Sequence, residues 1–419
     1  MIMMRINDRP PDQRALAKII SELEDISWQI SVNTDIGQQM TNSCIFFRKV
    51  VVTDQAEKDF LSRDGDIFTF SPSSYGNLLL IDVPQHIEKD LVDSIKAFCR
   101  VSDYKQLESV DGVIVTSKLD LAGCSWSSWG EESIIVRKMI LNFVEAARKH
   151  KYEVVTNLNT KGTTDSLLFR HKKSLQADLK EEMMMISLNR DDRIRLISCP
   201  GSIISVVEEV ITQHWERGLQ HSKEKTGFWE FKLAGNPWWA SGEDTVKARY
   251  LIANLITKLK SVGWEVAVTL DVSRRLNDKA VFVFRWAQCP PQIQPYAVLS
   301  FHEEDKIRFL SSSHDGQAVE AGIDRILASA NIIQNTKPYW KAKQWKIRGV
   351  PFSGAYCWGE DQRMILLLLT RIMKLLHQQG WRIVTSADVS AKYFKSKDQE
   401  YPLDNHSWFL LYDPNTRTE

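Results

Sequence analysis

The stretch SGEDTVKARYLIANLITKLKSVGWEVAVTLD, residues 241–271, contains the pattern that decides the fold. Ser241 precedes Gly242 and two acidic residues, and a capping hydroxyl followed by acidic side chains indicates the start of a helix. Apolar residues then recur at spacings of three and four, which is the pattern of an amphipathic helix. Gly263 ends this helix, and residues 264–268 predict the strand that follows it.

The same pattern extends on both sides of this stretch. Residues 229–233 alternate apolar and charged side chains, which predicts a strand before the helix. After the helix, apolar runs predict four strands at residues 264–268, 281–284, 296–301 and 307–310, and a second helix at 317–328. Strands joined by short polar turns imply an antiparallel sheet, with the two helices on one face. The predicted unit is therefore β-α-β-β-β-β-α, and the fold class is α+β.

This unit recurs along the chain at intervals of roughly 115 residues, which is the mark of a repeat protein. In each copy an aromatic residue ends the long helical pattern, and Asp or Asn follows seven residues later. The pairs are Trp28 and Asp35, Tyr152 and Asn159, Trp264 and Asp271, and Trp381 and Asp388. We therefore expect a tandem array of about four repeats, at residues 1–110, 111–220, 221–335 and 336–419. The first repeat lacks the first strand, and the fourth ends after its third strand.

Positions shared by every copy are typical of structure, because each copy needs the same core residue and the same turn. We expect the four aromatic residues to seat the helix on the sheet. The Asp and Asn residues are expected to fix a turn by accepting a hydrogen bond from their own backbone two residues on. Arg48, Arg170 and Arg285 each close a strand, either as exposed or ion-paired arginines or as a repeated anion contact. Neighbouring units are expected to pair edge to edge or through their helices, as an elongated array or as paired pseudo-dimers.

The composition is that of a soluble globular protein. Lys and Arg total 54 and Asp and Glu total 53, so the net charge of +1 exerts no strong pull on nucleic acid or anionic membranes. The six cysteines form no CxxC pair, which predicts no disulfide framework and reduced thiols in a cytoplasmic or nuclear protein. No apolar run is long enough for a transmembrane segment, and the N-terminus does not resemble a signal peptide.

Aromatic residues crowd the loop after the first strand of the repeats. They are Trp126, Trp129, Trp238, Trp239, Phe352, Tyr356 and Trp358. Because Trp and Tyr are favoured anchors in protein interfaces, these residues are the protein-binding candidates. The alternative is that they fold back over the sheet edge or pack between repeats.

A second candidate surface is the basic and aromatic stretch at residues 337–348. Its candidate residues are Lys337, Tyr339, Trp340, Lys341, Lys343, Trp345, Lys346 and Arg348. Such interleaving suits single-stranded nucleic acid, through phosphate contacts and base stacking. The alternatives are a different partner, such as an anionic membrane surface, or a linker that runs into a strand with lysines facing water.

No sequence motif for catalysis, cofactor binding or metal binding is present, so we expect no enzyme, no cofactor and no metal. Three functions compete. The first is a non-catalytic scaffold or adaptor, a complex subunit that binds proteins through an extended repeat surface with aromatic loops. The second is a nucleic-acid-binding module that uses residues 337–348. The third is an enzyme or small-ligand carrier with a pocket between helix and sheet. The sequence favours the scaffold.

Overall fold

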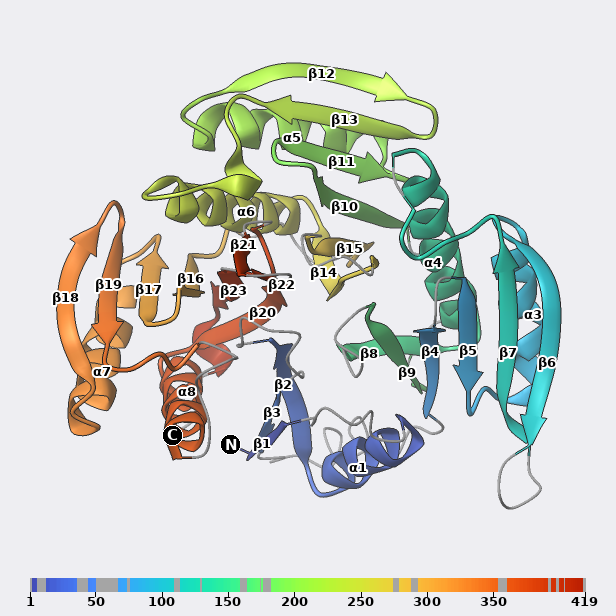
Figure 1. The fold of residues 1–419 in the computed structure, drawn as a ribbon, viewed down its shortest axis with the longest axis horizontal. Coiled ribbons are helices and arrows are strands. Elements are labelled where there is room, and N and C mark those ends of the chain that lie inside the picture. The colour runs from blue at the N-terminus through green and yellow to red at the C-terminus, as the bar shows by residue number, and fades with distance from the viewer. Residues whose placement is uncertain are drawn as a thin grey trace.

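The computed structural model of the protein is shown in Figure 1. It describes residues 2–5, 13–35, 44–49, 67–73, 76–108, 114–128, 130–158, 164–173, 175, 182–273, 279–287, 293–352, 360–390, 393–396, 399–402 and 404–416.

Three copies of one unit follow each other along the described chain, each with the order β-β-α-β-β-α-β-β. Unit I consists of β4 (Ile67–Ser73), β5 (Asn77–Ile81), α3 (Gln85–Lys96), β6 (Arg100–Glu108), β7 (Ile114–Ala122), α4 (Glu132–Lys149), β8 (Tyr152–Leu158) and β9 (Ser166–His171). Unit II consists of β10 (Met183–Asn189), β11 (Arg193–Ile197), α5 (Gly201–His214), β12 (Leu219–Lys225), β13 (Phe228–Leu233), α6 (Asp244–Ser261), β14 (Trp264–Leu270) and β15 (Val281–Trp286), with a 3-10 turn at Pro237–Trp239.

Unit III repeats this order and adds a small hairpin. It consists of β16 (Tyr296–His302), β17 (Lys306–Ser311), α7 (Gly316–Ser329), β18 (Ile333–Tyr339), β19 (Ala342–Ile347), α8 (Glu360–Gln378), β20 (Trp381–Ala387) and β23 (Asp404–Tyr412), with β21 (Tyr393–Ser396) paired to β22 (Gln399–Pro402) and a 3-10 turn at Pro414–Thr416. A partial N-terminal unit precedes the three copies. It consists of β1 (Ile2–Arg5), α1 (Gln13–Asp25), β2 (Trp28–Thr34) and β3 (Cys44–Lys49).

Each full unit forms one six-stranded antiparallel sheet. The strand orders are β6-β7-β5-β4-β9-β8 in unit I, β12-β13-β11-β10-β15-β14 in unit II and β18-β19-β17-β16-β23-β20 in unit III. The partial unit has a three-stranded sheet in the order β1-β3-β2. This is the tandem α+β fold with antiparallel sheets that the repeat pattern predicts.

The structure differs from the prediction in the phase of the repeat and in one strand per unit. The predicted boundary near residue 220 falls within β12, and the one near residue 335 falls within β18. A tandem repeat displays its period in the sequence, but its starting point is set by which strands share a sheet. The additional strands are the outer edge strands β6, β12 and β18, whose side chains are mostly polar.

Each sheet lies between two helical layers. In unit II, Met184 and Ile186 of β10 pack in one core with α5 and α6. The alternate residues Met183 and Met185 point to the opposite face and belong to a core that contains α4 of unit I. Because side chains alternate across a strand, one sheet thus joins two cores. The second helix of a unit therefore covers its own sheet and the next one.

The four units close into a ring instead of an elongated array (Figure 1). The helix α6 contacts β16 and β23 of unit III, and α8 contacts β1 of the partial unit. The partial unit contacts unit I in turn, through α1 on β4 and β2 on β8. Neighbouring units are therefore joined through their helices, which is one of the two modes expected from the sequence.

One disulfide corrects the expectation that all thiols are reduced. Cys99, just after α3, is bonded to Cys124, just after β7, and both are buried. Sequence spacing did not reveal the pair because 25 residues separate the two cysteines. Cys44 and Cys199 are thiols and not disulfide partners, and Cys289 and Cys357 lie outside the described residues. None of the described helices has the length and apolarity needed to cross a membrane.

Candidate functional site

Four inner strands, β2, β8, β14 and β20, contact one another around the centre of the ring. Each begins at one of the repeated aromatic residues, of which Trp28 is half-buried and the other three are buried. Each strand also carries a β-bulge at the same place, between the second and fourth residues after the aromatic. A bulge bends a strand and increases its local twist. The residues before the bulges line cavities, whereas those after them are joined by hydrogen bonds.

The half of the axis after the bulges is closed by hydrogen bonds that run from unit to unit. Carbonyl oxygens of three repeated aspartates accept from the backbone N–H of the neighbouring unit. The pairs are Asp165 N to Asp271 O at 2.9 Å, Ala280 N to Asp388 O at 3.1 Å and His406 N to Asp35 O at 3.2 Å. Asn33 Nδ2 also donates to the carbonyl of Asn157, at 2.6 Å. This end of the axis is structural.

The side chains of two repeated aspartates form turns. Asp271 Oδ1 accepts a hydrogen bond from Ser273 N at 3.0 Å, and Asp388 Oδ1 accepts one from Ser390 N at 2.9 Å. This is the Asx turn, in which the side chain bonds the backbone two residues on. Asn159 lies outside the described residues.

The half of the axis before the bulges holds a cavity of about 720 Å³, called the axial cavity below. It is formed by α1 and β2 of the partial unit, α4 and β8 of unit I and β14 of unit II. Its acidic lining residues are Glu22, Glu24, Asp25 and Glu153, and its basic lining residues are Arg148, Arg170, Lys172 and Arg285. Glu22 and Asp25 are exposed, so this end reaches solvent.

Ion pairs hold much of this lining in place. Arg170 Nη2 donates to Glu24 at 2.6 Å, and Arg285 donates to one oxygen of Glu265 at 2.6 and 2.9 Å. Burial raises the pKa of Glu24 to about 7, although the nearby Arg170 guanidinium opposes the rise. Glu24 is thus the carboxyl of the axial cavity that changes its charge near neutral pH.

A smaller cavity of about 150 Å³ adjoins the axial cavity and shares Val266 and Arg285 with it. Its lining includes Arg382 of β20, and Arg382 also acts on Arg48 of β3. Burial, with a further contribution from the charge of Arg382, lowers the pKa of Arg48. Arg48, Arg170 and Arg285, which the sequence aligned at strand ends, therefore all lie near the ring axis.

The loop aromatics do not form one exposed surface. Trp126, Trp238 and Phe352 are each at most 2% exposed and belong to three different cores. The indole N–H of Trp238 donates to the carbonyl of Arg193 at 2.9 Å. Trp239 is 36% exposed. The first three residues therefore fold back onto the sheets, which was the alternative interpretation. Trp129, Tyr356 and Trp358 lie outside the described residues.

The basic and aromatic stretch at residues 337–348 is the β18–β19 hairpin at the outer edge of unit III. Trp345 is fully buried, and its indole N–H donates to Asp324 Oδ1 at 2.7 Å. Lys343 pairs with the other oxygen of Asp324 at 2.5 Å, and Lys346 lies 3.5 Å from Asp305. Four other candidates take part in cation–π contacts. The ammonium group of Lys337 lies over the ring of Tyr339, and that of Lys341 lies over the rings of Trp340 and Tyr250. Lys337, Lys341 and Arg348 are exposed.

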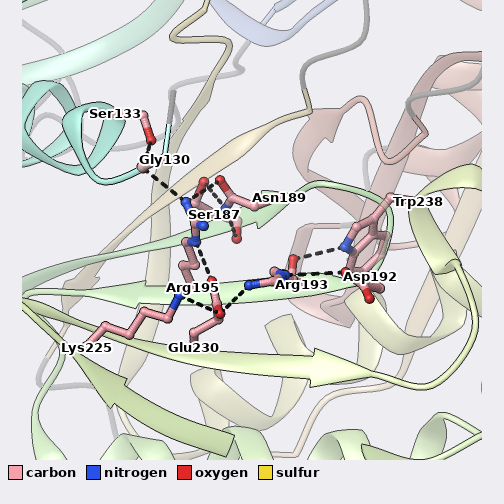
Figure 2. Close-up of polar contacts among 10 residues, drawn as sticks. All are labelled: Gly130, Ser133, Ser187, Asn189, Asp192, Arg193, Arg195, Lys225, Glu230 and Trp238. Carbon is pink, nitrogen blue, oxygen red and sulfur yellow. Dashed lines mark hydrogen bonds and ion pairs between the residues drawn. The ribbon is translucent and has the colours of Figure 1, made fainter. Parts of the chain in front are cut away.

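A buried charge cluster lies where unit I meets the sheet of unit II (Figure 2). Glu230 of β13 is fully buried and accepts from Arg193 at 2.6 Å and Arg195 at 2.9 Å, with Lys225 at 3.1 Å. Burial opposes the ionisation of Glu230, but the hydrogen bonds and charges of these cations lower its pKa overall. Arg195 also donates to the carbonyl of Gly130, before α4. The Glu230 carboxylate offsets part of the positive charge of these cations, and the cluster joins the two units.

Sequence reasoning missed the axial cavity because its lining residues come from three units and share no local motif. The repeated strand-end arginines were the one signal that pointed toward it. Among the described residues, no group of three or more His, Cys, Asp or Glu side chains is placed to hold a metal ion.

Comparison with known proteins supports the repeat architecture. One domain-family model matches the chain three times, over residues 66–170, 182–285 and 295–411. These stretches coincide with units I, II and III and cover more than half of the chain. No curated protein and no solved structure matches the chain. The chain therefore belongs to the family defined by this domain, which it carries in three consecutive copies.

Proposed function

We propose that the protein is a non-catalytic scaffold, a subunit of a complex that binds a protein partner at the axial cavity. The observation that supports this proposal is the mixed lining of that cavity, in which four acidic residues face four basic ones. A lining with charges of one sign would favour the binding of a simple anion or cation. A balanced lining instead suits a polypeptide segment, which carries charges of both signs and backbone amides.

The size of the cavity supports the same proposal. A volume of about 720 Å³ is within the range of roughly 300–1,000 Å³ that ligand pockets occupy. Three units contribute to the wall, so a bound segment would contact the partial unit, unit I and unit II together. Trp239, which is exposed, is the second proposed contact for the same partner.

The test reverses the charge of exposed residues at the rim of the axial cavity and leaves the buried core unchanged. In the double variant Glu22→Lys and Asp25→Lys, two exposed acids of the rim become basic. We expect a partner recovered in fixed ratio by affinity purification to be lost from this variant. The matched control is Glu209→Lys with Glu224→Lys, which makes the same charge change at exposed positions on the outer surface. Equal recovery with both variants would refute binding at the axial cavity.

Nuclease treatment of the same lysate separates the scaffold from a nucleic-acid-binding module. Partners that disappear with nuclease would favour the β18–β19 hairpin instead, through its exposed residues Lys337, Lys341 and Arg348. Trp239→Ala tests the second contact, whereas Trp238→Ala removes a fully buried indole and destabilises the fold.

The non-catalytic part of the proposal is tested at Glu24. A carboxyl that titrates near neutral pH is the kind of group that general acid–base catalysis uses. Glu24→Gln keeps the shape of the side chain and removes its ability to transfer a proton. We expect the variant to restore growth or phenotype in cells that lack the protein, and failure with intact folding and intact partner recovery would favour an enzyme. The proposed site of action is the cytoplasm or the nucleus.

A further inference from the structure

A second cavity, of about 320 Å³, lies between the first turn of α6 and the sheet of unit III. It occupies the same kind of junction as the Glu230 cluster, where the second helix of one unit meets the sheet of the next. Arg308 of β17 lies in its wall and is 4% exposed. Arg308 donates to Thr245 Oγ1 of α6 at 2.7 Å and to Gln344 Oε1 at 2.8 Å.

The strand register makes the two junctions directly comparable. In unit II, Arg195 pairs with Ser187 on one side and Glu230 on the other. In unit III, Arg308 pairs with Ser300 on one side and Gln344 on the other. Arg308 is thus the counterpart of Arg195, and Gln344 is the counterpart of Glu230. The carboxylate that accepts hydrogen bonds from the cations of unit II is replaced by a neutral amide in unit III.

The lining of this cavity carries an excess of positive charge. Its lining includes Lys306, Arg308 and Lys337 but only one carboxylate, Glu303, and that carboxylate pairs with Lys306. The cations therefore exceed the acids by two. The N-terminus of α6, an 18-residue helix, adds its partial positive charge to the same space. The nearby acid Asp244 is paired with Arg217, at 2.7 Å, and does not line the cavity.

We propose that this cavity binds the phosphate group of a small phosphorylated molecule beside the Gln344 amide, which stands where unit II has the Glu230 carboxylate. A phosphate monoester carries a charge of about −1.5 to −2 near neutral pH, which matches the excess charge of the lining. Arg and Lys side chains form strong charge-assisted hydrogen bonds with its oxygens. The volume exceeds that of a single carboxylate group and leaves room for part of the attached molecule.

Titration calorimetry on the full chain at constant ionic strength tests the proposal, with inorganic phosphate and pyrophosphate as probes. We expect saturable binding of both, and tighter binding of pyrophosphate. Lys337→Ala removes one cation of the lining and is expected to weaken binding several-fold. Lys341→Ala removes an exposed lysine of the same hairpin that does not line the cavity, and is expected to bind as the native chain does.

The decisive variant is Gln344→Glu, which restores the residue type of unit II at the equivalent position. The new carboxylate would pair with Arg308 inside the cavity and neutralise its charge. We therefore expect phosphate affinity to fall at least about tenfold. Thermal unfolding checks the fold, and the midpoint should be unchanged or raised. Native-like phosphate affinity in Gln344→Glu, or no binding by the native chain, would overturn the proposal. Binding of a single-stranded oligonucleotide without binding of pyrophosphate would also overturn it.

Discussion

At the scale of single residues, the axial cavity depends on groups whose charge is set by burial. The Glu24 carboxyl is the clearest case, because its pKa is about 7 in the folded protein and 4.5 in an ordinary exposed glutamate. Between these two values the native state binds more protons than the unfolded chain. The contribution of Glu24 to stability therefore decreases as pH rises from about 4.5 to 7.

Glu24→Gln should therefore stabilise the protein more at pH 8 than at pH 5. The pKa difference corresponds to at most about 3.5 kcal/mol, at about 1.4 kcal/mol for each unit. Urea unfolding followed by tryptophan fluorescence at both pH values measures the difference. Glu22→Gln, at an exposed position of the same helix, serves as the control. An equal effect of Glu24→Gln at the two pH values would contradict this account of the carboxyl.

Adjacent residues show the limit of sequence reasoning at this scale. Trp238 and Trp239 are the same residue type at adjacent positions, yet Trp238 is fully buried and Trp239 is exposed. A 3-10 turn at Pro237–Trp239 directs them to different environments, and its orientation depends on the sheet it packs against. The repeated aspartates were easier to interpret, because the Asx turns of Asp271 and Asp388 are formed within three residues.

At the scale of elements, the helices and inner strands could be predicted and the outer strands could not. The helix over residues 241–263 was visible because its apolar residues recur on one face. The strand β12 has the sequence LQHSKEK, and most of its residues are exposed or half-buried. An edge strand with this exposure has no apolar alternation to reveal it. Its charges, like Pro338 in β18, also prevent another chain from pairing with the open edge.

The Cys99–Cys124 disulfide joins the end of α3 to the end of β7 across 25 residues. Closing a loop of this length restricts the unfolded chain and is worth about 3 kcal/mol. Cys99→Ser with Cys124→Ser, or a reducing agent, should therefore lower the unfolding temperature, and the two effects should not add. Cys44→Ser serves as the control for loss of a buried thiol. Alkylation and mass analysis of protein from cells would show whether the bond exists there, and an unchanged unfolding temperature would contradict its role.

At the scale of the whole molecule, the sequence showed the number of units but not how they meet. Ring closure joins residues that are far apart in the chain, such as Ser386 Oγ and Thr34 Oγ1, which lie 2.8 Å apart. No local pattern encodes such a contact. The partial unit looked like an incomplete terminal repeat, but in the structure α8 of unit III covers its sheet, and its strand β2 completes the centre of the ring.

Two histidines make this closure sensitive to acid. His377 of α8 lies 2.9 Å from Ser31 Oγ, and His406 Nδ1 accepts from the backbone N–H of Asp35 at 3.3 Å. Burial lowers the pKa of each to about 4, and the charge of Arg48 also lowers that of His377. In the unfolded chain the two imidazole rings become protonated near pH 6.5, whereas in the native state they stay neutral until about pH 4. The stability that neutral His377 and His406 provide is therefore lost as pH falls through this window.

We expect the junction between unit III and the partial unit to loosen first on acidification, because both histidines contact the partial unit. Hydrogen exchange with mass spectrometry, corrected for intrinsic exchange rates, should show faster exchange in β2 and β3 at pH 5 than at pH 7.5, with β14 and β15 less affected. His377→Gln with His406→Asn should suppress the difference, and His221→Gln, at an exposed site, should not. Equal loosening of all junctions, or unchanged loosening in the double variant, would show that these histidines do not control the closure of the ring.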